Sequence, residues 1–337
     1  MTQDKKAVRN MQDELLVVRD LKTYFPIRKG LLQKTVGYVK AVDGVTFSIA
    51  RGTTMGLVGE SGCGKSTAGR TILRLQEKTG GSVHFAGEDL YGLDKKQLRQ
   101  LRPRMQIIFQ DPFSSLSPRL PVGELIGEAV RHHRIVPQGE LDDYISQIMV
   151  SCGLQPYHKN RYPHEFSGGQ RQRICIARAL AMKPKFIVCD ESVSALDVSV
   201  QAQIINLLKD LQQEHGMAYL FISHDLSVVE HICHQVGVMY LGSLVEYAST
   251  ETLYANPLHP YTQALLSAIP VPDPDAKMER VALKGNLPSP ADPPGGCKFH
   301  TRCPYAMEIC EAYVPDFVEL EEGHFCACHL HTPPKGQ

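Results

Sequence analysis

Short hydrophobic blocks separated by polar residues predict alternating strands and helices along the first two thirds of the chain. Apolar residues alternate with polar ones from Glu14 to Phe25 and again at Val45, Phe47 and Ile49, as in half-buried strands. Continuous apolar runs at 105–109, 186–189 and 219–222 are typical of buried parallel strands. A further strand is expected at 54–58, followed by a helix over 66–75. The pattern predicts an α/β fold.

Two segments depart from this alternation. Residues 122–154 have a helical pattern without a strand-like run, which predicts a helical subdomain inserted at about 111–165. Past Pro257, prolines form a connector that leads to a group of cysteines; they stand at 270, 272, 274, 288, 290, 293 and 294. We therefore expect a first domain over 1–256 and a C-terminal extension over 257–337.

Composition excludes several classes of protein. The 337 residues carry 36 Lys and Arg against 36 Asp and Glu, so no net charge attracts nucleic acid or anionic lipid. The length fits about two domains of roughly 150 residues. No stretch offers the ~18 nearly uncharged residues that a membrane-spanning helix needs, and the N-terminus lacks the apolar core of a signal peptide. The expected compartment is the cytosol.

The clearest chemical motif is the run GESGCGKST at 59–67, which fits the phosphate-binding pattern GxxxxGK[ST] between a strand and a helix. Its glycines let backbone N–H groups face an anion, and the positive end of the helix adds attraction. Lys65 supplies a mobile charge to the terminal phosphates, and Ser66 is the expected Mg²⁺ ligand. The candidate ATP-binding residues here are Gly59, Ser61, Gly62, Cys63, Gly64, Lys65, Ser66 and Thr67.

Two further motifs suit nucleotide chemistry. Residues 186–191, FIVCDE, end in Asp190, a candidate Mg²⁺ ligand, and Glu191, a candidate base for an attacking water. Taken alone, two adjacent acids could equally form a solvated turn. The run FSGGQ at 166–170 begins a helix and so forms a second anion site. One nucleotide rarely needs two phosphate cradles on one chain.

Together these motifs resemble those of the ATP-binding cassette (ABC) family: Walker A at 59–67, the signature loop at 167–170 and Walker B at 186–191. The resemblance implies a P-loop NTPase cassette with a RecA-like core, an antiparallel β subdomain and the inserted helical subdomain. It also implies a head-to-tail dimer of two cassettes, in which each signature loop binds the nucleotide of the opposite subunit. Those signature residues are Ser167, Gly168, Gly169 and Gln170.

The resemblance assigns roles to the remaining family markers. Gln110 is the Q-loop glutamine that contacts Mg²⁺ and water, and His224 is the switch histidine that reaches the γ-phosphate. With Glu191 these two form the expected catalytic set. Residues 194–197 match the D-loop, and Tyr24 is the expected aromatic partner of adenine, with Phe25 as the alternative.

One position departs from the family pattern. Ser192 stands where the family usually has proline, whose ring would fix φ and stiffen the turn that carries Glu191. Hydrolysis by Glu191 is still expected.

Longer segments resemble bacterial dipeptide and oligopeptide importer ATPases; they are EFSGGQRQRI, SALDVSVQAQIINLL, FISHDLSVVEHI, HPYTQALLSAI and LPSPADPPGGCKFHTRC. The resemblance implies ATP-driven peptide uptake from the cytoplasmic face of the inner membrane. It implies a second, different cassette subunit, two permease subunits and an extracytoplasmic binding protein as partners. Residues 109–132 would dock permease loops. Import of glutathione or a nickel chelate, or a soluble ABC ATPase without transport, remain alternatives.

The last five of the ten cysteines, Cys297, Cys303, Cys310, Cys326 and Cys328, crowd into a short segment. A cytosolic chain of this length does not need a disulfide framework. The gaps from Cys297 to Cys310 are wider than those of zinc ribbons, so an iron–sulfur cluster suits them better than zinc or free thiols. Similar importer cassettes carry a [4Fe-4S] cluster, which would use Cys297, Cys303, Cys310 and, by resemblance, Cys328 rather than Cys326.

Cys63 lies inside the phosphate loop. The helix end and Lys65 are expected to lower the pKa of its thiol. A bulky thiol reagent should then block ATP binding, and ATP should protect the thiol.

Overall fold

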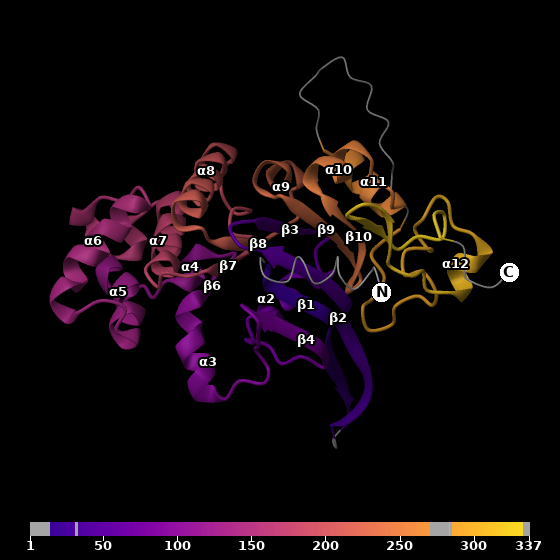
Figure 1. Ribbon diagram of the computed structural model, residues 1–337, viewed down its shortest axis with the longest axis horizontal. Coiled ribbons are helices and arrows are strands. Elements are labelled where there is room, and N and C mark those ends of the chain that lie inside the picture. The colour runs from indigo at the N-terminus through magenta and orange to yellow at the C-terminus, as the bar shows by residue number, and fades with distance from the viewer. Residues whose placement is uncertain (1–13, 31–32, 270–282, 284, 333–337) are drawn as a thin grey trace, which may run out of the picture. The chain divides into compact units, whose positions relative to one another are not determined.

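The computed structural model of the chain describes residues 14–30, 33–269, 283 and 285–332. The predicted connector prolines at 270, 272 and 274 and the N-terminal residues 1–13 lie outside this part. The described residues divide into two compact units: unit 1 comprises those within 14–16, 49–54 and 86–222, and unit 2 comprises those within 17–48, 55–85 and 223–332. Figure 1 labels most of the helices and strands of both units.

A parallel sheet of β6 (Met105–Ile108), β7 (Phe186–Asp190) and β8 (Ala218–Ser223) forms the centre of unit 1. In its register, Val188 pairs with Ile107 on one side and with Leu220 on the other. Every residue of β7 is buried, which accounts for its continuous apolar run. The carboxyl ends of parallel strands meet at one edge, so the polar residues after β6 and β7 share that edge.

Helices lie next to this sheet in unit 1, and α7 (Gly168–Leu180) contacts β6. The helices α5 (Val122–His133), α6 (Leu141–Ser151) and α7 pack against one another, as Figure 1 shows. Residues 111–165 are all described, and none lies in a β-strand; the helical pattern predicted at 122–154 therefore corresponds to α5 and α6. The other elements of this unit are β5 (Glu88–Asp89), α3 (Lys95–Leu101), α4 (Pro112–Ser115), α8 (Val198–His215) and the 3-10 turns η1 (Arg102–Arg104), η2 (Gln138–Glu140), η3 (Pro156–Asn160) and η4 (Pro163–Glu165).

Unit 2 contains two sets of strands. The strands β2 (Lys34–Ala50), β1 (Glu14–Lys29) and β4 (Gly80–Phe85) lie side by side in this order. In the other set, β3 (Thr54–Val58) runs parallel to β9 (Gln235–Tyr240). Next to β9 follow β10 (Ser243–Ser249), β12 (His324–Cys326) and β11 (Val318–Glu321), all antiparallel. The C-terminal cysteine region therefore continues this sheet.

The helices of unit 2 are short; they are α2 (Lys65–Ile72), α9 (Leu226–Ile232), α10 (Thr250–Ala255), α11 (Pro260–Ser267) and α12 (Glu308–Ala312). The predicted helix over 66–75 ends earlier than expected, because Arg74 takes a positive φ of 51°. In the described part of the chain, no helix combines the length and apolarity needed to cross a bilayer.

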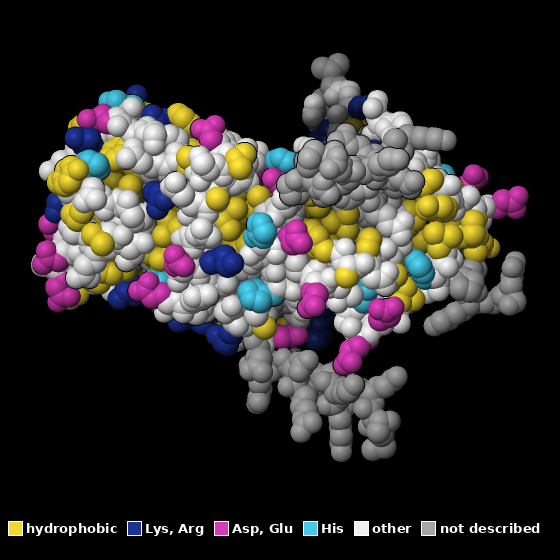
Figure 2. Space-filling view, turned by 90° about the horizontal axis from the view of Figure 1, so that it is seen from above, with side chains coloured by type: hydrophobic (Ala, Val, Ile, Leu, Met, Phe, Trp, Pro, Cys, Tyr) yellow, Lys and Arg dark blue, Asp and Glu magenta, His cyan; other side chains and the backbone are white. Residues whose placement is uncertain are grey.

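Charges of both signs share the surface. On the face shown in Figure 2, Lys and Arg side chains are interspersed with Asp and Glu side chains. Opposite charges are therefore neighbours on this face, in keeping with the equal numbers of basic and acidic residues in the chain.

Candidate functional site

The phosphate loop leads from the end of β3 into α2 with a backbone that only glycine permits. Gly59 and Gly64 have φ values of 148° and 107°. A Cβ atom would lie 2.2 Å from the carbonyl oxygen of Met239 at Gly59, and 1.9 Å from that of Ala41 at Gly64. Both glycines are therefore required by the close approach of neighbouring backbone.

Lys65 is 3% exposed and its ammonium turns back into this loop. Nζ donates to the carbonyl oxygens of Gly59, at 2.8 Å, and Glu60, at 3.1 Å. Ser66 and Thr67 are half-buried in the first turn of α2, whereas Ser61 and Gly62 are exposed at the loop tip. A triphosphate would compete with the two carbonyls for the ammonium group, because it offers full negative charge in place of partial charge.

The expectation of a lowered pKa for Cys63 is wrong. The side chain is 1% exposed, and burial raises the pKa of the thiol although Lys65 acts in the opposite direction. Loss of solvation for the thiolate outweighs the attraction of one ammonium group. Cys63 is therefore a buried, unreactive thiol in the wall of the loop.

Tyr24 and His224 are the other predicted nucleotide contacts of unit 2. The Tyr24 hydroxyl donates to Asp43 Oδ1 at 2.5 Å, and Lys40 Nζ lies 5.8 Å from the ring centroid. Burial, followed by the hydrogen bond to Asp43, raises the pKa of Tyr24. Phe25, the alternative, is half-buried, and His224 is exposed in the bend after β8.

In unit 1, Gln110 and Glu191 come together at the edge of the parallel sheet. The Gln110 amide Nε2 donates to Glu191 Oε2 at 2.8 Å. Asp190, the last residue of β7, is 2% exposed. Glu191 has a φ of 48°, a left-handed conformation that costs free energy for a residue with a side chain. The following Ser192 is buried, so the turn is held by packing without a proline.

The signature loop forms the start of α7 through a capping box. Gln170 N donates to Ser167 Oγ at 3.4 Å, and Ser167 N donates to Gln170 Oε1 at 3.0 Å. A Cβ at Gly169 would lie 2.4 Å from Val200 Cγ1, so this glycine allows α7 to approach α8 closely. Ser167 and Gln170 are exposed and therefore accessible to a ligand held by another chain.

The D-loop residues stand beside the signature loop and the turn at Glu191. Ser194 Oγ donates to the Glu191 carbonyl oxygen at 2.9 Å. A Cβ at Gly168 would lie 3.7 Å from Leu196 Cδ2. Ala195 is exposed, and Asp197 precedes the first residue of α8. Packing therefore links three of the predicted motifs within unit 1.

The C-terminal cysteines are all free thiols. Cys297 N donates to the carbonyl oxygen of Cys310 at 2.7 Å, which joins two of the predicted cluster ligands through the backbone. Within the described residues, no group of three or more His, Cys, Asp or Glu side chains is placed to hold a metal ion. The predicted iron–sulfur ligation therefore gains no support from this search.

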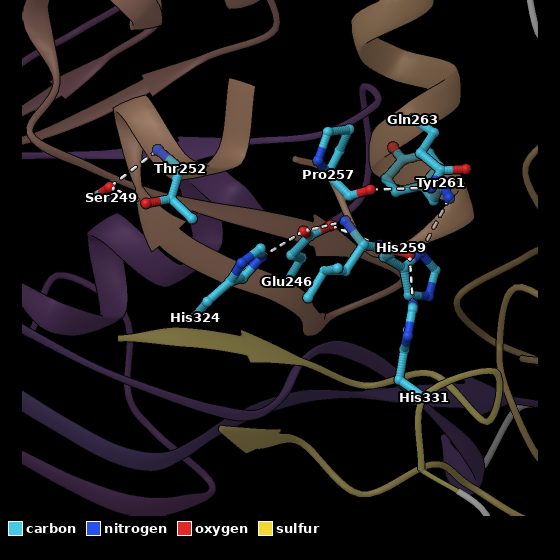
Figure 3. Close-up of polar contacts among 10 residues, drawn as sticks. Glu246, Ser249, Thr252, Pro257, His259, Tyr261, Gln263, His324 and His331 are labelled. Carbon is cyan, nitrogen blue, oxygen red and sulfur yellow. Dashed lines mark hydrogen bonds and ion pairs between the residues drawn. The ribbon is translucent and has the colours of Figure 1, made fainter. Parts of the chain in front are cut away.

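A buried carboxylate ties the C-terminal segment to the end of the cassette sequence, as Figure 3 shows. Glu246 is fully buried on β10 and accepts from Leu258 N at 2.7 Å, His259 N at 2.9 Å and His324 Nε2 at 2.8 Å. Burial, followed by the nearby His331, lowers the pKa of His259 to about 3, so its ring is neutral and its Nδ1 accepts from Tyr261 N.

Sequence reasoning missed several residues that bind to the predicted nucleotide contacts and hold them in place. Asp43 holds the hydroxyl of Tyr24, and Glu60 occupies a variable position of the phosphate motif. Lys298 and Arg302, in the cysteine region, pair with these two carboxylates. The only sequence signal was the place of Glu60 inside GESGCGKST, next to the glycine that opens the loop.

Comparisons with known proteins identify two matching families. The model of the ABC transporter family matches residues 42–194, and that of the oligopeptide/dipeptide transporter C-terminal region matches residues 245–310. An oligopeptide transport ATP-binding protein of Bacillus subtilis (strain 168) is 55% identical over 324 residues, covering 95% of this chain and 98% of that protein. A probable peptide ABC transporter ATP-binding protein of Sinorhizobium fredii is 51% identical, covering 96% and 92%.

Two solved structures are similar to this fold. One is the structure of cbiO1 from Clostridium perfringens, part of an ABC transporter complex, with a TM-score of 0.62, 26% identity and coverage of 72% of this chain and 92% of that one. The other is a dimeric ATP-binding cassette in a post-hydrolysis state bound to ADP and Pi, with a TM-score of 0.62, 25% identity and coverage of 70% and 98%.

Proposed function

This chain belongs to the ABC transporter family of ATP-binding proteins, and from this premise we propose that it hydrolyses ATP to drive the uptake of dipeptides or oligopeptides across the cytoplasmic membrane. The observation that carries the proposal is the 55% identity to an oligopeptide transport ATP-binding protein along 95% of the chain. That similarity includes the C-terminal region, for which the peptide-transporter model is specific.

Different residues of the site bind the phosphates and the metal ion. Lys65 exchanges the carbonyls of Gly59 and Glu60 for the terminal phosphates of ATP. Ser66, Gln110 and Asp190 would hold Mg²⁺, which would supply positive charge to the phosphates. The side-chain oxygens of these three residues are ligands of the kind that Mg²⁺ prefers.

Glu191 is the proposed base. Its carboxylate accepts a proton from the attacking water, and the hydrogen bond from Gln110 fixes one of its oxygens. The left-handed turn at Glu191 supports this role, since strained backbone is concentrated at functional positions. His224, exposed after β8, is the proposed contact of the γ-phosphate.

We assign the signature loop to the nucleotide of a second cassette, in a head-to-tail dimer. The exposed Ser167 and Gln170 at the start of α7 support this assignment, as does the dimeric form of a similar cassette. The proposed partner is a different cassette subunit, and two membrane permeases and an extracytoplasmic binding protein complete the importer. The chain itself acts at the cytoplasmic face of the inner membrane, with a first domain over 1–256 and an extension over 257–337.

The proposed permease-docking surface covers residues 109–132. Two large hydrophobic side chains there are exposed: Phe113 at 60% and Leu120 at 36%. The Arg171 guanidinium lies 4.2 Å from the Phe113 ring centroid and connects this surface to α7. An exposed aromatic next to a cation is typical of binding surfaces.

A [4Fe-4S] cluster on Cys297, Cys303, Cys310 and Cys328 is a separate proposal. Burial raises the pKa of Cys328 to about 11, and the charges of the other three thiols add to the rise, which supports their proximity. The main neighbouring charge at Cys326 is Glu246, which favours Cys328 as the fourth ligand. A four-iron cluster needs its thiolates farther apart than a single ion does.

Iron and sulfide analysis of anaerobically purified chain tests the cluster. We expect about four irons and four sulfides per chain, absorbance in the visible range, and loss of both in Cys328→Ser but not in Cys326→Ser. A colourless, iron-free preparation would overturn the cluster.

Uptake of a labelled dipeptide or oligopeptide into proteoliposomes containing the complete importer tests the transport function. We expect ATP-dependent uptake with the wild-type chain and its loss with Glu191→Gln. A complex that hydrolyses ATP but takes up glutathione or a nickel chelate and no peptide would overturn the substrate class.

A further inference from the structure

Glu60, the second residue of the phosphate loop, is held at both its backbone and its side chain. Its backbone N–H donates to the Tyr261 hydroxyl at 2.9 Å. Its carboxylate accepts two hydrogen bonds from Arg302, at 2.6 Å from Nη1 and 2.9 Å from Nη2. Both partners come from the region after the cassette core, and Arg302 stands 242 positions further along the chain. The loop that faces the phosphates is therefore supported by the C-terminal extension.

The Arg302 side chain is held in place by burial and by packing against an aromatic ring. It is 6% exposed, and its guanidinium lies 5.9 Å from the ring centroid of Tyr240. The rings of Tyr240, Tyr261 and Phe299 pack on one another with centroids 4.8 to 5.4 Å apart. The hydrogen bonds to Glu60 are the main cause of a raised pKa for Arg302. A bidentate, largely buried pair of this kind fixes geometry more firmly than a surface ion pair.

Lys298 pairs with Asp43, the carboxylate that accepts the Tyr24 hydroxyl, as Arg302 pairs with Glu60. Its ammonium donates to Asp43 Oδ2 at 2.9 Å, to the Leu241 carbonyl at 3.0 Å and to Ser243 Oγ at 2.8 Å. The other oxygen of Asp43 accepts the Tyr24 hydroxyl. Burial raises the pKa of Asp43, but the hydrogen bonds from Tyr24 and Lys298 outweigh it, so the pKa lies below the usual value. Asp43 is therefore a charged link between Lys298 and Tyr24.

We propose that the segment 297–303 positions both parts of the nucleotide site: Arg302 sets the affinity for the triphosphate through Glu60, and Lys298 sets the affinity for the adenosine part through Asp43 and Tyr24. This inference rests on the proposed ATP-binding function and extends it. Lys298 and Arg302 are positioning residues, since each acts through a carboxylate, Asp43 or Glu60. The cysteine-rich extension thereby takes part in nucleotide binding, in addition to any cluster it holds.

The positive charge of Arg302 is expected to affect phosphate binding directly, by compensating the negative charge of Glu60. The carboxylate of Glu60 belongs to the loop that binds a triphosphate, so without a partner it would repel the ligand. Removing Arg302 exposes this repulsion, and removing the Glu60 charge as well relieves it. The two substitutions are therefore expected to be coupled rather than additive.

The test measures equilibrium binding of Mg·ATP and of inorganic tripolyphosphate to the full chain. For Arg302→Ala we expect about 10-fold weaker binding of both ligands. The double variant Arg302→Ala/Glu60→Gln should bind like Glu60→Gln alone. Lys298→Ala should weaken ATP binding about 10-fold and leave tripolyphosphate binding unchanged. Lys96→Ala, an exposed lysine on α3, serves as the matched control.

The outcomes separate this inference from the function on which it rests. If the wild-type chain binds neither ligand, the proposed function fails. A second outcome is that the wild-type chain binds ATP and Lys65→Ala does not, which leaves the proposed function intact. If Arg302→Ala and Lys298→Ala then both bind ATP within twofold of wild type, the positioning role is overturned. Thermal unfolding of each variant identifies loss of fold. Should Arg302→Ala unfold, Arg302→Gln, which removes the charge but keeps a long polar side chain, must bind tripolyphosphate more weakly than wild type, and equal binding would refute the role.

Discussion

The carboxamide of Gln110 donates a hydrogen bond to the carboxylate of Glu191 at 2.8 Å, joining the second residue after β6 to the first residue after β7. The two residues follow adjacent parallel strands of unit 1, so the sheet brings them to the same edge. A change in the position of Gln110 is therefore transmitted directly to the proposed base. Gln110 also belongs to the proposed permease-docking surface, which gives a route from the membrane partner to hydrolysis.

Glu191→Gln is expected to keep ATP affinity and to lower steady-state hydrolysis by about 10²- to 10⁴-fold, because an amide cannot accept the proton of the attacking water. Phosphate release and nucleotide binding are measured on the same preparation. Glu140→Gln, an exposed glutamate before α6, is the control. Unchanged turnover in Glu191→Gln would remove this residue from the role of base.

Ser167→Ala separates the binding role of the signature loop from its helix-capping role. Loss of the cap is expected to lower the free energy of unfolding by about 1 kcal/mol. Asp94→Ala is the matched control, because Asp94 and Gln97 form the same kind of capping box at α3. We expect similar losses of stability in both variants but a fall in ATP hydrolysis only in Ser167→Ala. Equal hydrolysis in the two variants would leave Ser167 with capping alone.

Cys63 should react slowly with maleimides in the folded chain, because burial both shields the thiol and raises its pKa. Mass spectrometry of modified peptides, in native buffer and in denaturant, measures the ratio of rates. We expect modification to be at least about 100-fold faster in denaturant than in native buffer, because in the folded chain the thiol is exposed only during rare local opening. Fast modification of Cys63 in the native chain, with protection by ATP, would restore the reactive thiol that the sequence alone predicts.

His324→Ala leaves the buried carboxylate of Glu246 without one of its three hydrogen-bond donors. We expect a loss of about 1–3 kcal/mol in the free energy of unfolding, the range typical of leaving a buried polar group without one of its hydrogen-bond partners. Denaturant titration measures it, with His231→Ala at the exposed end of α9 as control. A loss below about 1 kcal/mol would show that Glu246 does not depend on His324.

The sequence allowed prediction of the features that depend on neighbouring residues. The apolar run at 186–189 is the buried strand β7, and the glycines of 59–64 have the positive φ values that the phosphate motif requires. Contacts between distant segments could not be predicted. Lys298 and Asp43 are 255 positions apart, and nothing in the local pattern of either shows that it has a partner. The direction of the pKa shift at Cys63 also depends on burial, which a motif does not reveal.

Equilibrium binding of Mg·ATP to the purified chain, compared between wild type and Lys65→Ala, tests the central claim most directly. The account predicts that wild type binds and that Lys65→Ala binds about 100-fold more weakly, because the charged donor to the terminal phosphates is lost. Lys209→Ala, an exposed lysine on α8, should bind like wild type. Equal affinity of wild type and Lys65→Ala for Mg·ATP would contradict the assignment of residues 59–67 as the nucleotide site.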